Sequence, residues 1–148
     1  MNNIFNSAFE LSLRVLILMK TKKTRVTVDW LSCIDFVTTY GKDFGVSEFN
    51  LHGDNEYRFS EYAAKREIIG AAIKELVLRG YITPHCNKSG FNYSITPAGI
   101  QLCETLNDAY AETYEKIAEM AINHFANYPD RKLMNCLNEK AILALGGK

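Results

Sequence analysis

The stretch LVLRGYITPHCNKSGFNYSITPAGIQL, residues 76–102, decides the expected fold. A helix is expected to end at Gly80, because glycine readily adopts the left-handed conformation that terminates helices. Residues 81–84 and 91–95 flank a polar turn at 87–90, and this arrangement is typical of a β-hairpin. The chain therefore places a short hairpin directly behind a helix.

Further helices are predicted from apolar residues at helical spacing and from residue types that cap helix ends. They cover residues 8–19, 28–40, 61–79, 97–126 and a last short helix after 129. The expected capping residues are Ser7 (in a capping box with Glu10), Thr27, Ser60, Thr96 before Pro97, and Asp130. The expected buried stripe of the third helix consists of Ala64, Ile68, Ala72, Ile73, Leu76 and Val77.

Three helices, a hairpin and another helix are the order of a winged-helix protein. The expected fold class is mainly α with a small β-hairpin, a winged helix-turn-helix followed by C-terminal helices. Residues 1–96 are expected to form the winged-helix core, with the wing at 81–95, and residues 97–148 a docking and packing extension. The segment 42–60 holds many large apolar side chains between its glycines and asparagines, which predicts an ordered loop pinned to the body.

Composition argues against several classes of function. Seventeen basic residues balance seventeen acidic ones, and a neutral protein binds duplex DNA only if its basic residues gather on one face. The four cysteines are scattered without metal-ligand spacing, so free thiols are expected in a reducing cytoplasm. The longest apolar run, residues 15–19, is too short to span a bilayer, and no signal peptide is visible. A cytoplasmic location is expected.

Catalytic signatures are missing from the sequence. It contains no phosphate-binding glycine loop, no metalloprotease motif and no nucleophile elbow. His52, His85 and His124 fall on three different predicted elements, and none has an acidic neighbour at a spacing that would form an acid–base pair. We therefore expect neither an enzyme nor a cofactor or metal site.

Four basic residues are candidates for polar contacts with DNA or a partner. Lys65 and Arg66 lie near the start of the third helix, where recognition helices touch base edges. Arg58 precedes them, and Lys88 lies at the tip of the hairpin. The alternative interpretation is that these residues form solvated faces with local ion pairs. Weak, sequence-independent contact with the phosphate backbone is an intermediate interpretation.

The helix expected from Pro97 onward favours partner binding over DNA binding. One face carries five acidic residues and only one lysine, so it would repel phosphates. This helix and the next also carry more apolar side chains than one small core requires, which is common at subunit interfaces. The candidate docking surface consists of Tyr110, Tyr114, Ile117, Met120, Phe125 and Leu137.

The motifs together resemble a known family, the middle components of bacterial ABC three-component systems. These are small winged-helix subunits encoded beside an SMC/Rad50-like ATPase, and they include the small subunit of Lamassu-type anti-phage systems. The resemblance spans roughly residues 4–125. Its motifs are Phe5-Asn6-Ser7, Leu13-Arg14-Val15-Leu16, Asn50-Leu51-His52-Gly53, Tyr57-Arg58, Glu61, Lys65-Arg66-Glu67-Ile68-Ile69, Leu78-Arg79-Gly80-Tyr81-Ile82, Gly90-Phe91-Asn92-Tyr93, Leu106 and Tyr110. Family members often carry proline near Gly53 or Glu56, and this chain has none there.

The resemblance implies an adaptor without catalytic activity in anti-phage or anti-plasmid defence. Such a subunit would join the heads of an SMC/Rad50-like ATPase to an effector nuclease and touch DNA, if at all, non-specifically and through the complex. The alternative is a winged-helix transcription regulator that dimerises through its last two helices. A third interpretation is a structural module of some other assembly.

Overall fold

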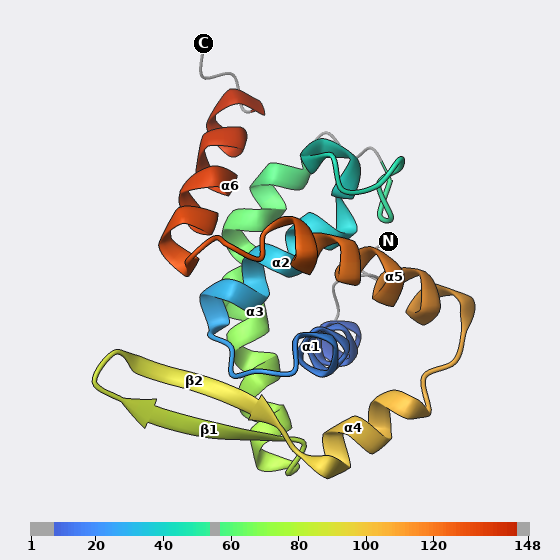
Figure 1. Cartoon of the computed structure of the whole chain (residues 1–148), viewed down its shortest axis with the longest axis vertical. Coiled ribbons are helices and arrows are strands. Elements are labelled where there is room, and N and C mark those ends of the chain that lie inside the picture. Colours follow the sequence, from blue (N-terminus) through green and yellow to red (C-terminus); the bar gives the residue numbers. More distant parts are fainter. Residues whose placement is uncertain (1–7, 54–56, 145–148) are drawn as a thin grey trace.

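The computed structural model describes residues 8–53 and 57–144 (Figure 1). Its elements are α1 (Ala8–Lys22), α2 (Val28–Thr39), the short 3-10 helix η1 (Gly41–Phe44), α3 (Arg58–Leu78), β1 (Ile82–Asn87), β2 (Gly90–Ile95), α4 (Pro97–Glu104), α5 (Ala109–His124) and α6 (Asp130–Ala144). The protein is thus mainly helical with one antiparallel hairpin, as the sequence predicted. No helix in the described ranges is both long and apolar enough to cross a membrane.

Local capping explains where several helices begin. The hydroxyl of Thr27 accepts a hydrogen bond from the Trp30 amide at 3.0 Å, and Thr96 caps α4 in the same way. Both predicted starts are confirmed. The predicted cap at Ser60 is wrong, because the Tyr57 carbonyl already accepts the Ser60 amide and α3 begins earlier. Ser7, the other predicted cap in the amino-terminal part, lies outside the described residues.

The single helix predicted for residues 97–126 is two helices, α4 and α5. Thr105 ends α4 by donating its hydroxyl to the Leu102 carbonyl at 2.6 Å. Asp108 then caps α5, since its carboxylate accepts the Ala111 amide at 2.8 Å. Ser, Thr and Asp side chains compete with helical backbone bonds in this way, and the break lets the chain change direction between the two helices (Figure 1).

The hairpin has the predicted position and a regular register. Ile82 pairs with Ile95 at its base, and Asn87 pairs with Gly90 at its turn. Gly80, with a φ of 82°, occupies the left-handed position that ends α3. Val26 and Tyr93 exchange two backbone hydrogen bonds of 3.0 and 2.8 Å. The connection between α1 and α2 is thereby attached to the edge of the hairpin.

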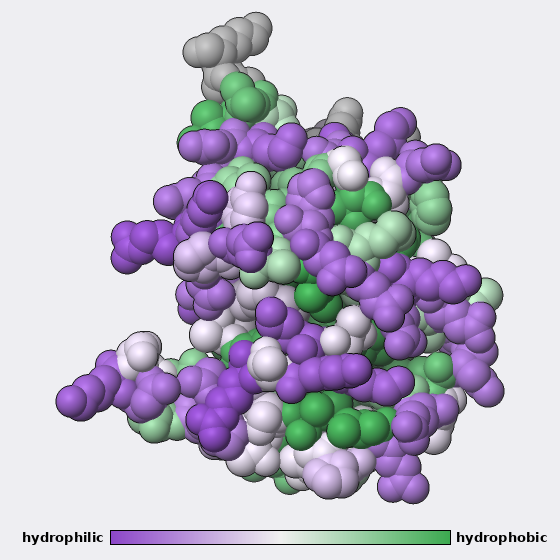
Figure 2. Space-filling view, viewed as in Figure 1, coloured by the Kyte–Doolittle hydropathy of each residue, from purple (hydrophilic) through white to green (hydrophobic). Residues whose placement is uncertain are grey.

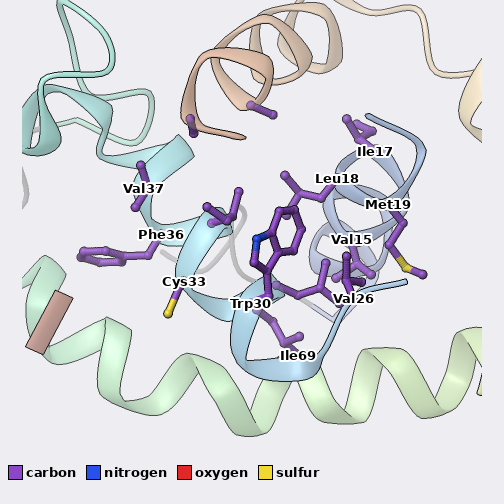
Figure 3. Packing of buried hydrophobic residues seen from close by; sticks show 14 of the residues in the cluster. Val15, Ile17, Leu18, Met19, Val26, Trp30, Cys33, Phe36, Val37 and Ile69 are labelled. Atoms are coloured by element: carbon purple, nitrogen blue, oxygen red, sulfur yellow. The ribbon is translucent and has the colours of Figure 1, made fainter. Parts of the chain in front are cut away.

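Helix α2 lies at the centre of the core. Every residue from Trp30 to Thr39 is buried, and the surrounding cluster draws on α1, α3, α5 and α6. In Figure 3, Trp30 lies close to Leu18 of α1, whereas Phe36 points away from that helix. Both predicted segments, 1–96 and 97–148, contribute to this cluster. The division into a winged-helix core and a docking and packing extension stays a prediction.

The buried face of α3 differs from the predicted stripe. Ala64 is exposed and Ile68 is 38% exposed, whereas Lys65 and Ile69 are buried at 2% and 0%. The buried face consists of Phe59, Lys65, Ile69, Ala72, Ile73 and Leu76. Ala72, Ile73 and Leu76 are buried as predicted, so the difference is confined to the first half of α3. There Lys65 and Ile69 are buried in place of Ala64 and Ile68, because Lys65 faces the carboxylate of Asp35 in α2.

A glycine pair in two helices gives a direct test of this packing. A Cβ on Gly99 would lie 2.7 Å from Cγ1 of Ile95 and would clash with the Tyr81 carbonyl oxygen, whereas none of the described atoms comes within 4 Å of a Cβ on Gly70. We expect Gly99→Ala to lower the free energy of unfolding by about 1–3 kcal/mol through overpacking. Gly70→Ala, the matched control, should raise it by roughly 0.5–1 kcal/mol. Urea unfolding measures both, and equal effects would contradict the close approach of α4 to the hairpin.

Candidate functional site

A buried ion pair joins α1 to α2 at the centre of the protein. The Arg14 guanidinium donates from Nε to Oδ1 of Asp35 at 2.8 Å and from Nη2 to Oδ2 at 2.7 Å. Both side chains are 1% exposed. Two parallel bonds between a guanidinium and a carboxylate are strong and fix the geometry of both groups. The pair therefore sets the position of α1 against α2.

Two further helices contribute to the same carboxylate. Tyr114 of α5 donates its hydroxyl to Oδ1 of Asp35 at 2.6 Å, and Nζ of Lys65 from α3 lies 3.5 Å from Oδ2. Tyr114 is 0% and Lys65 is 2% exposed. We call Arg14, Asp35, Lys65 and Tyr114 the Asp35 cluster. One carboxylate thus contacts side chains from three neighbouring helices.

The charges in the cluster shift the pKa values of its members. Burial alone would raise the pKa of Asp35, but the charges of Arg14 and Lys65 outweigh it and hold that pKa well below the usual range. Burial lowers the pKa of Lys65 against the attraction of Asp35. Burial also raises the pKa of Tyr114 well above its ordinary value. The tyrosine therefore stays protonated and remains a hydrogen-bond donor.

A second pair, His52 and Tyr110, lies beside the cluster. Nε2 of His52 and the Tyr110 hydroxyl are 2.7 Å apart, and the Tyr110 ring stacks on Tyr114 with centroids 6.3 Å apart. Burial and the nearby charge of Arg14 lower the pKa of His52 to about 3. The imidazole is therefore neutral near pH 7 and anchors its loop to α5.

The ordered loop predicted for residues 42–60 is confirmed in its described parts. Asn50 accepts the Lys42 amide on its side-chain oxygen at 2.9 Å, and Arg58 donates from Nε to Asp43 at 2.5 Å. Phe44, at one end of the loop, packs edge-on against Phe36 with centroids 6.0 Å apart. Phe44 and Phe59 are buried and Val46 and Leu51 pack against the core, although Phe49 and Tyr57 are exposed.

Buried to this extent, the Asp35 cluster fixes how four helices pack. A substrate would have to reach side chains that are at most 2% exposed. Over the described ranges, no group of three or more His, Cys, Asp or Glu side chains lies together in a way that could hold a metal ion.

The structure separates the four basic residues proposed as contacts. Lys65 is inside the Asp35 cluster, so it is not available to DNA or to a partner in this structure. Arg66 is 60% exposed and pairs with Asp29 of α2. Arg58 is 23% exposed and pairs with Asp43, and Lys88 is exposed in the hairpin turn. Arg66 and Lys88 therefore lie on the surface but on different elements.

Most of the proposed docking side chains face the core. Tyr114, Ile117, Phe125 and Leu137 are between 0% and 5% exposed, and Met120 is 46% exposed. The reason is that α5 covers α1 and α2 and uses its apolar face for that contact. These four side chains are not free to form an outward docking surface in this structure.

Comparison with protein families gives a match along nearly the whole chain. The family described as ABC-three component (ABC-3C) system Middle Component 2 matches residues 4–145. The chain belongs to this family. As a Middle Component 2 protein it is an accessory component of an ABC-three component defence system, and a middle component implies partner subunits. The searches of curated proteins and of solved structures returned no significant match.

Four residues of the motifs that suggested this family come together in the fold. Arg14 and Lys65 belong to the Asp35 cluster, and His52 and Tyr110 form the adjacent pair. The sequence placed them on four separate segments. In this Middle Component 2 protein, these motif residues therefore organise the interior.

Proposed function

We propose that this Middle Component 2 protein is an adaptor without catalytic activity. It connects an SMC/Rad50-like ATPase of its system to an effector nuclease, in the manner of the small subunit of Lamassu-type systems. ATP hydrolysis and DNA cleavage belong to those partners. Membership of a family of middle components supports a role beside partner subunits, and the interior site described above supports a scaffold.

A winged-helix architecture fits the arrangement of the first three helices and the hairpin. In such folds a segment between the first two helices joins the edge of the wing, and here Val26 bonds to Tyr93 of β2. The third helix, α3, precedes the hairpin and takes the place of a recognition helix. We therefore propose that residues 1–96 are a winged helix-turn-helix with an enlarged loop before α3.

The exposed residues of α3 indicate whether this helix contacts a protein or DNA. It exposes Glu67, Lys74 and Glu75 together with the apolar Ile68 and Leu78, the latter 82% exposed. A recognition helix needs an excess of positive charge to approach phosphates. The other exposed basic residues of this helix and its C-cap, Arg66 and Arg79, are balanced by ion pairs with Asp29 and Glu75. Contact with protein surfaces suits it better, and any DNA contact would be non-specific, through Lys88 and the assembled complex.

Purification from the intact operon tests the proposal. We expect a tagged chain, co-expressed with its neighbouring genes, to bring down a large ATPase subunit in a stoichiometric complex that native mass spectrometry can weigh. The isolated chain should bind duplex DNA weakly and without sequence preference. Recovery of a lone homodimer that binds its own promoter would identify a transcription regulator instead and overturn the adaptor.

A further inference from the structure

A hollow of about 260 Å³ lies where the connection between α1 and α2 meets the start of α6. Thr27 of the connection donates its hydroxyl to Oδ2 of Asp130 at 2.5 Å, which ties the two segments together. Val26 of the same connection bonds to Tyr93 of the hairpin. In Figure 1 the connection runs between the start of α6 and the hairpin, so three segments that are distant in the sequence meet here.

Basic side chains surround this hollow. Lys22 and Arg25 line it, and Lys23 lies between them in the connection. Lys132 of α6 lies over the ring of Tyr128, which also lines the hollow. We call Lys22, Lys23, Arg25 and Lys132 the basic surface. None of the four forms an ion pair with a carboxylate of the described residues. The basic surface therefore carries an excess of positive charge.

Aromatic rings rather than carboxylates hold two of these cations. Nζ of Lys22 lies 5.5 Å from the centroid of the Trp30 ring, and Nζ of Lys132 lies 4.4 Å from the centroid of the Tyr128 ring. The face of an aromatic ring attracts a cation, but it carries no net charge that would neutralise it. Both ammonium groups are therefore still able to attract an external anion.

The backbone of Lys23 adds an independent observation. Among the described residues other than glycine, Lys23 alone has a positive φ, of 70°. It follows the end of α1, at a position where glycine is usual, and a residue with a Cβ adopts this conformation at a cost in free energy. Backbone strain of this kind is often found at functional sites. The connection thus holds a lysine where a glycine would be less strained.

We propose that the basic surface binds the phosphate backbone of duplex DNA without reading its sequence. A chain of zero net charge can bind duplex DNA only where its basic residues gather, and here they gather around one hollow. A polymer with regularly spaced phosphates can contact cations from both segments at once, and such contacts carry no sequence information. Figure 2 shows hydrophilic side chains across the front of the molecule between α6 and the hairpin, whose turn adds the exposed Lys88.

Other occupants fit the basic surface less well. Val26, Trp30 and Phe125 line the hollow but are between 4% and 7% exposed, so its accessible surface is mainly polar. The core of a protein–protein interface is more apolar than this, whereas protein–DNA interfaces are polar and positively charged. Single-stranded DNA would need accessible rings on which its bases could stack. This inference rests on the proposed adaptor function for the presence of DNA in the complex, and it names the surface that the DNA touches.

A triple variant with a matched control tests the basic surface. The triple variant is Lys23→Gln, Arg25→Gln and Lys132→Gln, and the control removes three exposed charges elsewhere, by Lys74→Gln, Lys116→Gln and Lys140→Gln. Fluorescence anisotropy of a short labelled duplex measures binding to the isolated chain over a range of salt concentrations. The triple variant should bind at least about tenfold more weakly at low salt, and the slope of log affinity against log salt should fall by about 2–3, since each phosphate contact contributes about 0.9. The control should stay within about threefold of the wild type.

A single substitution separates the cation from its role at the helix end. Lys23→Gly relieves the strained backbone, so its melting temperature should be no lower than that of the wild type. Its affinity for the duplex should nevertheless fall by about threefold to tenfold, because one phosphate contact is lost. A residue that only completed the helix end would leave DNA binding unchanged when replaced by glycine.

Three results would overturn the basic surface. The first is a wild-type chain that does not bind the duplex, and the second is an equal loss of affinity in the control. The third is wild-type affinity in both the triple variant and Lys23→Gly; if the triple variant then also failed to capture its partner from the operon, the surface would bind an acidic protein instead. None of these results removes the adaptor function, which fails separately if the wild-type chain brings down no other subunit.

Discussion

Replacing Asp35 by asparagine is expected to lower the free energy of unfolding by about 3–5 kcal/mol, the usual cost of removing one partner from a buried ion pair. The shape of the side chain is kept, but its charge is lost. Arg14 and Lys65 would then be two buried cations without the carboxylate that both contact. The free energy of unfolding of a domain is commonly only about 5–15 kcal/mol. This variant should therefore be partly unfolded at 37 °C.

The measurement is the midpoint of urea unfolding, followed by circular dichroism. Asp108→Asn makes the same chemical change at the exposed N-cap of α5, where asparagine caps nearly as well as aspartate. The free energy of unfolding of Asp108→Asn should lie within about 0.5 kcal/mol of that of the wild type. If Asp35→Asn behaves like this control, the carboxylate does not organise the core.

A further comparison separates charge balance from packing. Lys65→Met removes one cation and leaves the two bonds between Arg14 and Asp35 in place. Lys65 makes no hydrogen bond to the residues described here. We therefore expect Lys65→Met to change the free energy of unfolding by less than about 1 kcal/mol, in either direction. The combination of Lys65→Met with Asp35→Asn should be less damaging than Asp35→Asn alone, because one buried cation then remains instead of two.

Features that depend on local chemistry could be predicted from the sequence. Thr27 and Thr96 start helices because their hydroxyls reach amides three residues away. The hairpin follows from strand alternation and the turn before Gly90. The division between α4 and α5 was missed, although Thr105 and Asp108 are residue types that end and begin helices. Apolar residues continue at helical spacing on both sides of the break, and this pattern hides the local signals.

The Asp35 cluster was missed because its members meet only in three dimensions. Lys65 was predicted to contact DNA or a partner because it lies near the start of the third helix, where recognition helices touch base edges. A signal was nevertheless present: Asp35 lies between the apolar Ile34 and Phe36 in the middle of one predicted helix, and Arg14 lies between the apolar Leu13 and Val15 in the middle of another. An acidic residue in one buried helix and a basic residue in another are expected to form an ion pair, because burying either charge without a partner costs much free energy. The burial of Lys65 in place of Ala64 in the first half of α3 follows from the same attraction to Asp35.

The stability of the protein is expected to fall as the pH drops from about 6.5 to 3, because of His52. In the folded state the pKa of His52 is lowered to about 3 from an ordinary value of 6.5. Between these two values the unfolded chain binds a proton that the folded chain does not, so acid favours unfolding. The full stability is present above pH 6.5 and is lost progressively towards pH 3, at no more than about 1.4 kcal/mol per pH unit.

The physical reason is the position of the ring. A protonated His52 would be a buried cation close to Arg14 and Lys65, whose charges already lower its pKa. Asp35 changes the stability of the protein in a separate pH range, because its pKa is lowered from an ordinary value of 3.8. Its contribution is complete above that value and disappears only at lower pH. Loss of stability between pH 6.5 and 4 therefore reports on His52 rather than on Asp35.

Urea unfolding at half-unit intervals from pH 7.5 to 4 measures this dependence. His52→Gln keeps a side chain that can hydrogen-bond to Tyr110 but cannot titrate, so its stability should be nearly constant across the window, even if it is lower at pH 7. His124→Gln, at the exposed end of α5, should retain the slope of the wild type. A wild-type curve that stays flat down to pH 4.5, or an undiminished slope in His52→Gln, would show that the ring is not held neutral against α5. Agreement would establish that the loop carrying His52 is fastened to the core by an uncharged imidazole, and that acid lowers the stability of the fold through this ring before the carboxylate of Asp35 is protonated.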